Sequence, residues 1–352
     1  MAAKNVVGLD IGSSSIKVIH LKEDRKGVHL QAFDVQMLPP ETVVDGTLMN
    51  FTAVADKLKE VMSANRIRGK DVCVGVSGNS VIIKKISLPE MTVDELEESI
   101  QWEAEQYIPF DIKDVNVDVQ IVNDKAGQGQ MDVLLVAAKK DVINDYTSVI
   151  NEAKLRVQVV DVDTFAIQNC FELNYGYPVD ETIALVNVGA SVININVIAN
   201  GMTTFTRDVS MGGGLLTAEI QKHLNVSFEE AEHYKTVGEG NITNSTIARE
   251  VQALSEKVSQ TLVTEIQRSL DFYAATTVEA DIARLYLSGG AAQTQSLIRA
   301  LERNLEVPVE LVNPFKNILI DPKRFDVDLL QRMAPVAAVA VGLGLRKPGD
   351  RA

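Results

Sequence analysis

Small, hydroxyl-bearing and charged residues interrupt the apolar N-terminal sequence "VVGLDIGSSSIKVIHLK" at residues 6–22. A bound phosphate needs converging backbone N–H groups, side chains small enough for the backbone to approach, and often a hydroxyl or a lysine. This turn offers all of these, and Asp10 ends an apolar run, where a carboxylate would hold the waters of a Mg²⁺ ion. The alternative is a Gly/Ser hairpin turn without a ligand. The phosphate-binding candidates are Gly12, Ser13, Ser14, Ser15 and Lys17.

Two further glycine turns precede predicted helices. In "SMGGGLLTAEI" the glycines stand at a helix N-terminus, where free N–H groups and the helix dipole favour an anion. In "LSGGAAQTQ" the missing side chains would let a flat base lie against the backbone. For both turns the alternative is a glycine-rich bend. The candidates are Gly212, Gly213, Gly214, Gly289 and Gly290.

The first turn recurs half a chain later. "GLDIGSSSIKVI" at residues 8–19 matches "LVNVGASVININVI" at residues 185–198, and the offset of 177 aligns Asp10 with Asn187 and Gly12 with Gly189. Repetition at this spacing predicts two similar α/β domains that face each other, with both turns opening into a shared cleft.

Composition excludes several classes of function. The 352 residues carry a formal net charge of −14, which argues against a nucleic-acid surface because phosphate backbones favour clustered Lys and Arg. Two separated cysteines and four scattered histidines have no metal-ligand spacing. The N-terminus has no signal-peptide pattern, and the longest apolar run, residues 334–345, is shorter than the roughly 20 residues that cross a bilayer. We therefore expect a cytoplasmic chain that contacts membranes only through partners.

The elements that would position these residues follow an α/β pattern. Strand-like segments at the N-terminus precede an amphipathic helix in "FTAVADKLKEVMSANRI". Residues 81–156 look like an α+β insert of a strand, a helix, a hairpin and a closing helix, and Thr92 with Glu95 forms a capping box for the first helix. A long helix is predicted from about Thr246 to Thr276.

Taken in order, five segments resemble motifs of the actin-like ATPase superfamily, in particular its FtsA-like branch and the PilM family of type IV pilus assembly proteins. The resemblance covers essentially the whole chain. It implies an actin-like (ASKHA) fold, in which two related α/β domains surround a nucleotide cleft and an FtsA-type 1C subdomain is inserted. The segments are "VVGLDIGSSSIKVIHL", "ALVNVGASVININVI", "SMGGGLLTAEIQKHLNVSFEEAEHYK", "LYLSGGAAQTQSLIRALE" and "APVAAVAVGLGLR". The implied subdomains are 1A (1–82, 157–180 and 330–352), 1C (83–156), 2A (181–210 and 281–329) and 2B (211–280).

The resemblance also implies roles for individual residues. Residues 12–15 and Lys17 would surround the β- and γ-phosphates of ATP, with Asp10 near Mg²⁺, and Gly189 would belong to the second phosphate loop. Glu232 and Lys235 would bracket the ribose and adenine. Without a nucleotide, these two would be a surface ion pair worth a few tenths of a kcal/mol. Gly289 and Gly290 would back the base.

One departure from the superfamily concerns hydrolysis. Active hydrolases usually place an acidic residue in the second phosphate loop, where this chain has Asn187. A neutral amide cannot balance the charge of Mg²⁺ or pull on an attacking water as a carboxylate does. Asp163 falls where relatives have a water-orienting acid, and Asp161 is the alternative. We therefore expect binding of ATP and Mg²⁺, with weak or absent hydrolysis.

The resemblance favours a cytoplasmic ATP-binding protein of the type IV pilus inner-membrane assembly platform. Its expected partners are the cytoplasmic N-terminal tail of PilN, bound in a groove beside subdomain 1C, and other pilus platform proteins. One alternative is an FtsA-like cell-division filament, against which the lack of a C-terminal amphipathic helix weighs. Another is a small-molecule kinase of the same superfamily, for which no polar sugar pocket is evident.

Overall fold

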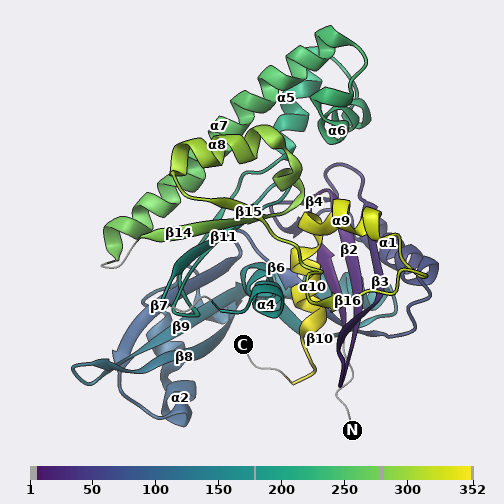
Figure 1. Ribbon diagram of the computed structural model, residues 1–352. Coiled ribbons are helices and arrows are strands. Elements are labelled where there is room, and N and C mark those ends of the chain that lie inside the picture. The colour runs from purple at the N-terminus through teal and green to yellow at the C-terminus, as the bar shows by residue number, and fades with distance from the viewer. Residues whose placement is uncertain (1–5, 178–179, 278–280, 350–352) are drawn as a thin grey trace.

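Two mixed β-sheets of the same design form the centre of the molecule, as the computed structural model shows for residues 6–177, 180–277 and 281–349 (Figure 1). The first sheet has the order β10-β6-β1-β2-β3-β16, and the second has the order β13-β12-β11-β14-β15. The strands of the first sheet are β1 (Val7–Ile11), β2 (Ser15–Asp24), β3 (Gly27–Met37), β6 (Asp71–Val76), β10 (Arg156–Val162) and β16 (Ile318–Leu319). Those of the second are β11 (Thr182–Val188), β12 (Ile193–Ala199), β13 (Met202–Val209), β14 (Ile282–Ser288) and β15 (Val309–Leu311).

The two sheets repeat one topology. In each, three consecutive strands form an antiparallel meander (β1-β2-β3 and β11-β12-β13), and two later strands add in parallel beside the first (β6 and β10, β14 and β15). This repetition confirms the prediction of two related α/β domains. Its consequence is that β1 and β11 are central strands, so the turns that follow them emerge at equivalent places in the two sheets.

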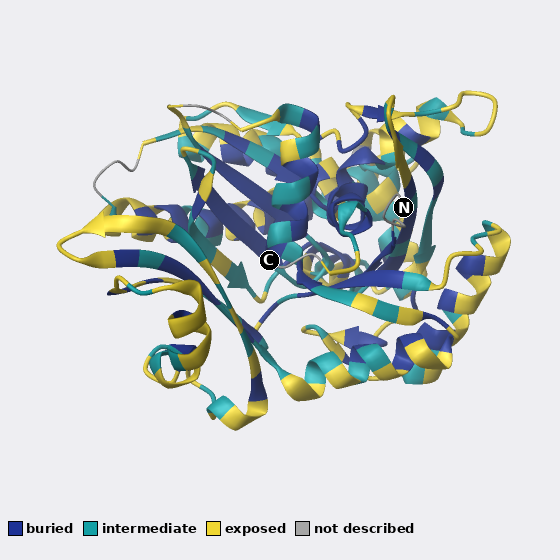
Figure 2. Ribbon diagram, turned by 90° about the horizontal axis from the view of Figure 1, so that it is seen from below, coloured by how far each residue is buried: buried dark blue, intermediate teal, exposed yellow. Residues whose placement is uncertain are grey.

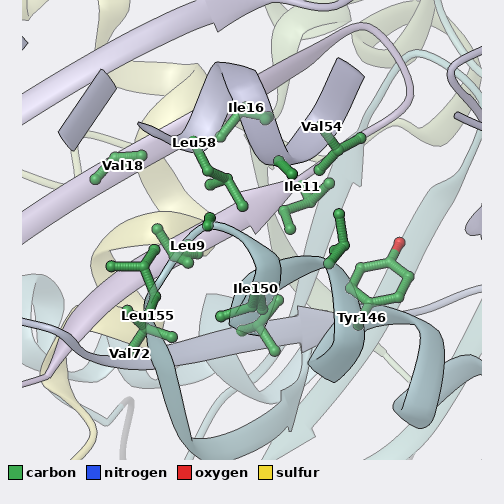
Figure 3. Packing of buried hydrophobic residues seen from close by; sticks show 14 of the residues in the cluster. Leu9, Ile11, Ile16, Val18, Val54, Leu58, Val72, Tyr146, Ile150 and Leu155 are labelled. Carbon is green, nitrogen blue, oxygen red and sulfur yellow. The ribbon is translucent and has the colours of Figure 1, made fainter. Parts of the chain in front are cut away.

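The first domain has its core between its sheet and the helices that cover it. Side chains of α1 and α3, among them Leu58 and Ile150, meet those of β1 and β2, such as Leu9 and Ile16, in one buried cluster (Figure 3). The helices of this domain are α1 (Phe51–Ala64), α3 (Lys140–Glu152), α4 (Asp163–Tyr175), α9 (Val327–Met333) and α10 (Ala338–Leu345). A short hairpin joins β4 (Val43–Val44) to β5 (Thr47–Leu48).

The second domain is dominated by a long helix. This is α7 (Ser245–Thr276), close to the predicted range, and its buried face packs with the second sheet and neighbouring helices. A capping box of Ser227 and Glu230 begins α6. The other helices are α5 (Gly214–Leu224), α6 (Phe228–Val237) and α8 (Gln295–Leu305). Short 3₁₀ turns lie at Ile112–Asp114, Glu239–Asn241, Gly290–Gln293 and Ala334–Ala337.

A small α+β subdomain extends from the first domain. Its sheet has the order β7-β9-β8, and α2 packs on one face, with the predicted capping box of Thr92 and Glu95. Gln128 and Gly129, both with positive φ, form the tight turn between β8 and β9. Figure 2 shows exposed residues concentrated on this projecting unit and buried ones on the central strands. The elements are β7 (Val81–Pro89), α2 (Val93–Ala104), β8 (Val115–Gly127) and β9 (Gln130–Lys139).

Two contacts cross the predicted subdomain boundaries. Helix α3, predicted to close the insert, packs through Tyr146, Val149 and Ile150 in the core of the first domain. The pairing of β16 with β3 brings the chain back to the first sheet at Ile318, earlier than residue 330. The remaining boundaries stay predictions, and those at residues 1, 280 and 352 lie outside the described residues. An amphipathic pattern reveals which helix face is apolar, but not which sheet that face covers.

The C-terminal helical stretch Val327–Leu345 is long and apolar enough to cross a membrane by length and composition alone. The sequence analysis counted only the uninterrupted run 334–345 and so missed its full length of 19 residues. In the described residues, 61% of its most apolar window is buried inside the protein. Its buried residues include Ala337, Ala340 and Val341, which belong to the hydrophobic core beside the first sheet. This burial is typical of a core helix.

Helix α10 approaches α4 so closely that only glycine fits at the crossing. A Cβ atom added to Gly342 would lie 1.7 Å from the carbonyl oxygen of Ala166. We predict that Gly342→Ala lowers the free energy of unfolding by about 3 kcal/mol or more, because backbone must move to relieve the overlap. Urea denaturation measures the change. The control is Gly69→Ala, whose added Cβ would meet Val7 at an ordinary 3.5 Å; equal stability of the two variants would contradict the prediction.

Candidate functional site

A cleft of about 770 Å³ lies between the two domains, and most of the predicted site residues line it. Gly212 and Gly214 are the predicted residues that do not line the cleft, although Gly213 between them does. The predicted residues brought together are Asp10, Gly12, Ser13, Ser14, Ser15, Lys17, Asp163, Asn187, Gly189, Gly213, Glu232, Lys235, Gly289 and Gly290.

Two equivalent hairpin turns meet in the cleft. In the first turn the N–H of Gly12 donates to the carbonyl of Ser15 at 3.1 Å. In the second the N–H of Gly189 donates to the carbonyl of Val192 at 2.9 Å. The hydroxyls of Ser13 and Ser191 are hydrogen-bonded to each other, so the tips of the two turns touch across the domain boundary.

The turn tips leave backbone donors available. In the described part of the chain, the N–H groups of Ser13, Ser14, Ala190 and Ser191 donate to no other protein atom. Unpaired N–H groups in a tight turn form a concave site that favours anions. The ammonium of Lys17 lies beside the first turn, 3.0 Å from where a Cβ on Gly12 would be. Phosphate groups therefore fit the geometry of both turns.

The strands that carry the turns present unequal residue pairs. In the first domain Asp10 faces Lys17 across the β1–β2 ladder, and the two form an ion pair at 3.2 Å. In the second domain Asn187 faces Asn194 at the equivalent position, and the Nδ2 of Asn187 donates to the Oδ1 of Asn194 at 3.0 Å. A charged pair on one side of the cleft is thus matched by two neutral amides on the other.

Asp163, the tentative catalytic residue, begins α4 in the wall of the cleft. Burial, together with the negative charge of Asp10, raises the pKa of Asp163 to about 7. A hydrogen bond from Ser77 and the charge of Lys17 oppose this shift. At neutral pH this carboxyl group can therefore hold or release a proton. Asp161, the alternative, is buried on β10 and does not line the cleft.

A metal ion in this cleft would need oxygen atoms from a bound ligand to complete its coordination. In the residues that the structure describes, no group of three or more His, Cys, Asp or Glu side chains is placed to hold a metal. Mg²⁺ commonly takes one or two carboxylates together with nucleotide phosphates. Asp10 fits the first part of that requirement, so the residues present are compatible with Mg²⁺ as a nucleotide-bound ion.

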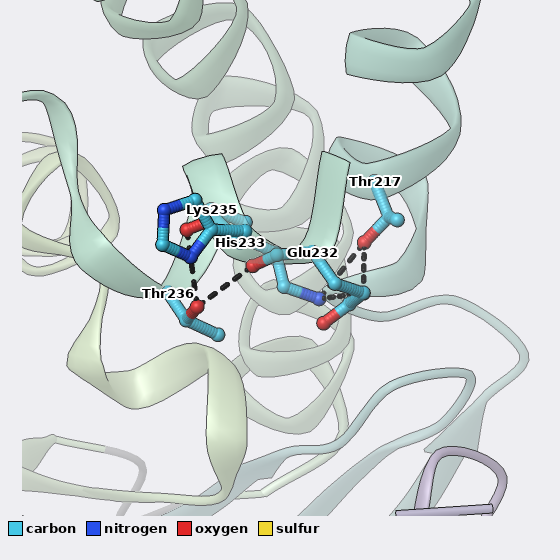
Figure 4. A network of polar contacts seen from close by, with 5 residues as sticks. All are labelled: Thr217, Glu232, His233, Lys235 and Thr236. Carbon is cyan, nitrogen blue, oxygen red and sulfur yellow. Dashed lines mark hydrogen bonds and ion pairs between the residues drawn. The ribbon is translucent and has the colours of Figure 1, made fainter. Parts of the chain in front are cut away.

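Glu232 and Lys235 form a partly buried ion pair at the far side of the cleft (Figure 4). Their side chains are 15% and 18% exposed. Both contact Thr217 of α5, whose hydroxyl donates to Glu232 and accepts from Lys235, the latter at 2.8 Å. Because both residues line the cleft, they are available to polar groups of a ligand as well as to each other.

The expected anion site at the N-terminus of α5 is not present in the predicted form. The N–H groups of Gly213 and Gly214 already donate to the carbonyls of Gly189 and Ala190, each at 2.8 Å. A Cβ on Gly212 would lie 2.4 Å from the carbonyl oxygen of Gly189. The three glycines therefore let α5 pack against the second turn, and the free donors lie in that turn instead.

The other glycine turn leaves room in the cleft. Gly289 has φ +93°, and a Cβ there would lie 2.4 Å from the carbonyl oxygen of Val188, so this position requires glycine. An added Cβ on Gly290 would meet its nearest atom, from Val336, only at 3.9 Å. The open backbone at Gly290 is what a flat ring would need.

Four polar residues of this region were not among the predicted site residues: Ser77, Ser191, Asn194 and Asp208. Two of them carried a usable signal, because Ser191 aligns with Ser14 in the repeat and Asn194 aligns with Lys17 at the same offset of 177. Asp208 had no such signal: it pairs with Asn194 on the neighbouring strand, but its partner in the first domain, Gly78, lies 130 residues away.

Comparison with known proteins identifies a family whose model matches this chain. The family model for type IV pilus assembly protein PilM matches residues 8–348. A solved structure described as a PilM–PilN type IV pilus biogenesis complex is similar to this chain with a TM-score of 0.86 and 28% identity, covering 97% of this chain and 98% of the other.

More distant similarities are consistent with the fold. Cell division protein FtsA of Bacillus subtilis is 25% identical over 260 residues, which are 65% of this chain and 57% of FtsA. The match to FtsA of Streptococcus pneumoniae covers 54% of that protein, so the chain spans little more than half the length of these curated relatives. MreB5 of Spiroplasma citri bound to ADP has a TM-score of 0.51 at 11% identity, with 96% and 94% of the two chains covered, and shares the fold.

The raised pKa of Asp163 predicts a pH dependence of stability. Its folded pKa of about 7 exceeds the unfolded value, so the native state keeps a proton that the unfolded state releases between about pH 4 and 7. The contribution of this group to the free energy of unfolding is therefore present at low pH and is lost as the pH rises through 7. We expect Asp163→Asn to gain about 1 kcal/mol or more over the wild type between pH 5 and pH 8.

Denaturant unfolding without nucleotide measures this difference. The control is Asp328→Asn, which replaces an exposed carboxylate on α9 and should unfold like the wild type under each condition. Parallel pH profiles of the wild type and Asp163→Asn would contradict the assignment.

Proposed function

The chain belongs to the PilM family of type IV pilus assembly proteins, and from this membership we propose that it is an ATP-binding, actin-like component of the pilus assembly platform. It works on the cytoplasmic side of the inner membrane and reaches that membrane through its partners. The observation that carries the nucleotide part of the proposal is the pair of facing turns, with four unpaired N–H groups, in one cleft.

ATP fits the chemistry of the cleft from end to end. The N–H groups of the two turns and Lys17 would hold the phosphates, and the second turn would contact the same phosphates from the opposite domain. Glu232 and Lys235 would bind the ribose and the base, and the open backbone at Gly290 would face the ring. When bound with ATP, Mg²⁺ would neutralise phosphate charge, with Asp10 holding its waters.

Slow hydrolysis follows from Asn187. Its amide nitrogen donates to Asn194 and its amide oxygen accepts from Ser288, so each polar atom already has a hydrogen-bond partner. It carries no negative charge to balance a metal or to orient water. Asp163 is a candidate to accept a proton, but it lacks a second acid in the opposite turn. The protein would therefore hold ATP as a structural ligand between its domains.

The proposed partner is the cytoplasmic N-terminal tail of PilN, bound beside the small subdomain, with other platform proteins joining the assembly. Support comes from the similar solved structure, which is described as a PilM–PilN complex and aligns with 97% of this chain. The nucleotide would set the distance between the domains and so the shape of the tail-binding groove.

Restoring an acid in the second turn tests the account of hydrolysis. We expect wild-type protein with Mg²⁺ to keep bound ATP intact over hours, and Asn187→Asp to convert it to ADP faster, because a carboxylate can act on the metal and water. Chromatography of the extracted nucleotide measures both.

Lys17→Met serves as the control for contaminating ATPases, since loss of the ammonium weakens phosphate binding and should leave no turnover. Equal conversion by the wild type and Asn187→Asp would contradict the role assigned to the missing charge.

Binding of the partner tail tests the cellular role directly. A fluorescently labelled peptide with the sequence of the PilN N-terminal tail from the same organism should bind the full chain in the presence of ATP, and a scrambled peptide should not. Fluorescence anisotropy measures the affinity. If neither peptide binds, or both bind equally, the proposed role in the pilus platform is wrong.

A further inference from the structure

A relay of hydrogen bonds runs from the nucleotide cleft of the second domain into the first domain. The hydroxyl of Ser288 donates to the Oδ1 of Asn187 at 3.2 Å, and the Nδ2 of Asn187 donates to the Oδ1 of Asn194 at 3.0 Å. The Nδ2 of Asn194 then donates to the Oδ1 of Asp208 on β13, at 2.9 Å. The Oδ2 of Asp208 accepts the backbone N–H of Gly78 from the other domain at 2.6 Å.

Most side chains of the relay are buried in the protein interior. Ser288, Asn187 and Asn194 are each at least nine-tenths buried. Burial raises the pKa of Asp208, and the two hydrogen bonds from Asn194 and Gly78 oppose that shift. In the part of the chain that the structure describes, no Lys or Arg is recorded in an ion pair with Asp208. Its carboxylate therefore depends on these two donors, and losing either would leave a buried acceptor oxygen without a partner, which is costly.

One end of the relay belongs to the cleft. Ser288 immediately precedes the turn at Gly289 and Gly290, and Asn187 is the residue of β11 that lines the cleft near the second phosphate turn. The relay therefore begins between the positions proposed for the base and for the phosphates.

The other end of the relay lies in the loop before β7, where the chain enters the small subdomain. The backbone N–H of Val81, the first residue of β7, donates to the carbonyl of Gly78 at 3.0 Å. The backbone N–H of Lys139, the last residue of β9, donates to the carbonyl of Ser80 in the same loop at 3.0 Å. The neighbouring Ser77 is hydrogen-bonded to Asp163 of the first domain. The strand that enters the subdomain and the strand that leaves it are thus both hydrogen-bonded to a loop that also contacts Asp208 of the second domain.

We propose that Asp208 is a positioning residue that couples nucleotide occupancy of the cleft to the placement of the small subdomain, and so to binding of the PilN tail. The proposal rests on the proposed function. A hydrogen bond is lost when the distance between its donor and acceptor atoms increases by about 1 Å. ATP that bridges both turns holds the domains at the distance where Asp208 reaches Gly78, and opening of the empty cleft releases the loop.

Hydrogen–deuterium exchange of the full chain tests the coupling at its point of action. The peptide to follow is residues 76–82, with and without ATP and Mg²⁺. In the wild type we expect ATP to slow exchange at the Gly78 amide about tenfold or more, because a bond to a buried charge is gained. In Asp208→Ala the slowing should vanish, since no acceptor replaces the carboxylate.

Two variants make the result specific. Asp208→Asn can keep the relay with its direction reversed, because each amide both donates and accepts, so ATP should still slow exchange in this variant. Asp271→Ala removes an exposed carboxylate from α7 of the same domain and should behave like the wild type. The affinity of the labelled tail should rise with ATP about tenfold in the wild type and in Asp208→Asn, and be independent of ATP in Asp208→Ala.

The outcomes separate the two proposals. ATP binding that leaves exchange at residues 76–82 unchanged in the wild type overturns the coupling, and this measurement needs no variant to fold. Equal ATP effects in the wild type and Asp208→Ala overturn it as well. Failure of the wild type to bind ATP in a direct titration refutes the proposed function itself, and the coupling with it.

Discussion

The contact between Ser13 and Ser191 joins the two domains at the tips of their equivalent turns. It exists because each sheet places its first strand at the centre and follows it with a tight turn of small residues. Larger side chains at the tips would hold the turns apart and cover the N–H groups between them. The same requirement explains the glycines beside the second turn, where the backbone of Gly212 lies against Gly189 and Ala190. The cleft is therefore a product of close backbone packing more than of charge.

Charge nevertheless decides what the cleft can do. After burial, the negative charges of Asp10 and Asp208 raise the pKa of Asp163, and the positive charge of Lys17 opposes that shift. A triphosphate added to this set brings further negative charge, so binding favours a divalent cation and proton uptake at Asp163. A fourth acid at position 187 would increase the repulsion. The neutral Asn187 adds no further negative charge to this set.

Features that depend on local order could be predicted from the sequence, and those that depend on distant partners could not. The turns at Gly12 and Gly189 were found because strand, turn and strand are consecutive and repeat at one offset. The packing of α3 against the first sheet could not be read from the sequence, because its apolar stripe fits either sheet. The donors of Gly213 and Gly214 were expected to be free because the sequence does not show which carbonyls approach them. Asp208 escaped notice because its partner, Gly78, is 130 residues away.

The amide at position 187 has a structural reason as well as a chemical one. An amide has a donating and an accepting end, whereas a carboxylate only accepts. In the relay, Asn187 donates to Asn194 and Asn194 donates to Asp208, so the direction of every bond is fixed by the carboxylate at the end. A carboxylate at position 187 would face the Oδ1 of Asn194, and turning that amide over would direct its oxygen at Asp208. A carboxylate at position 187 is therefore incompatible with this chain of hydrogen bonds to the first domain.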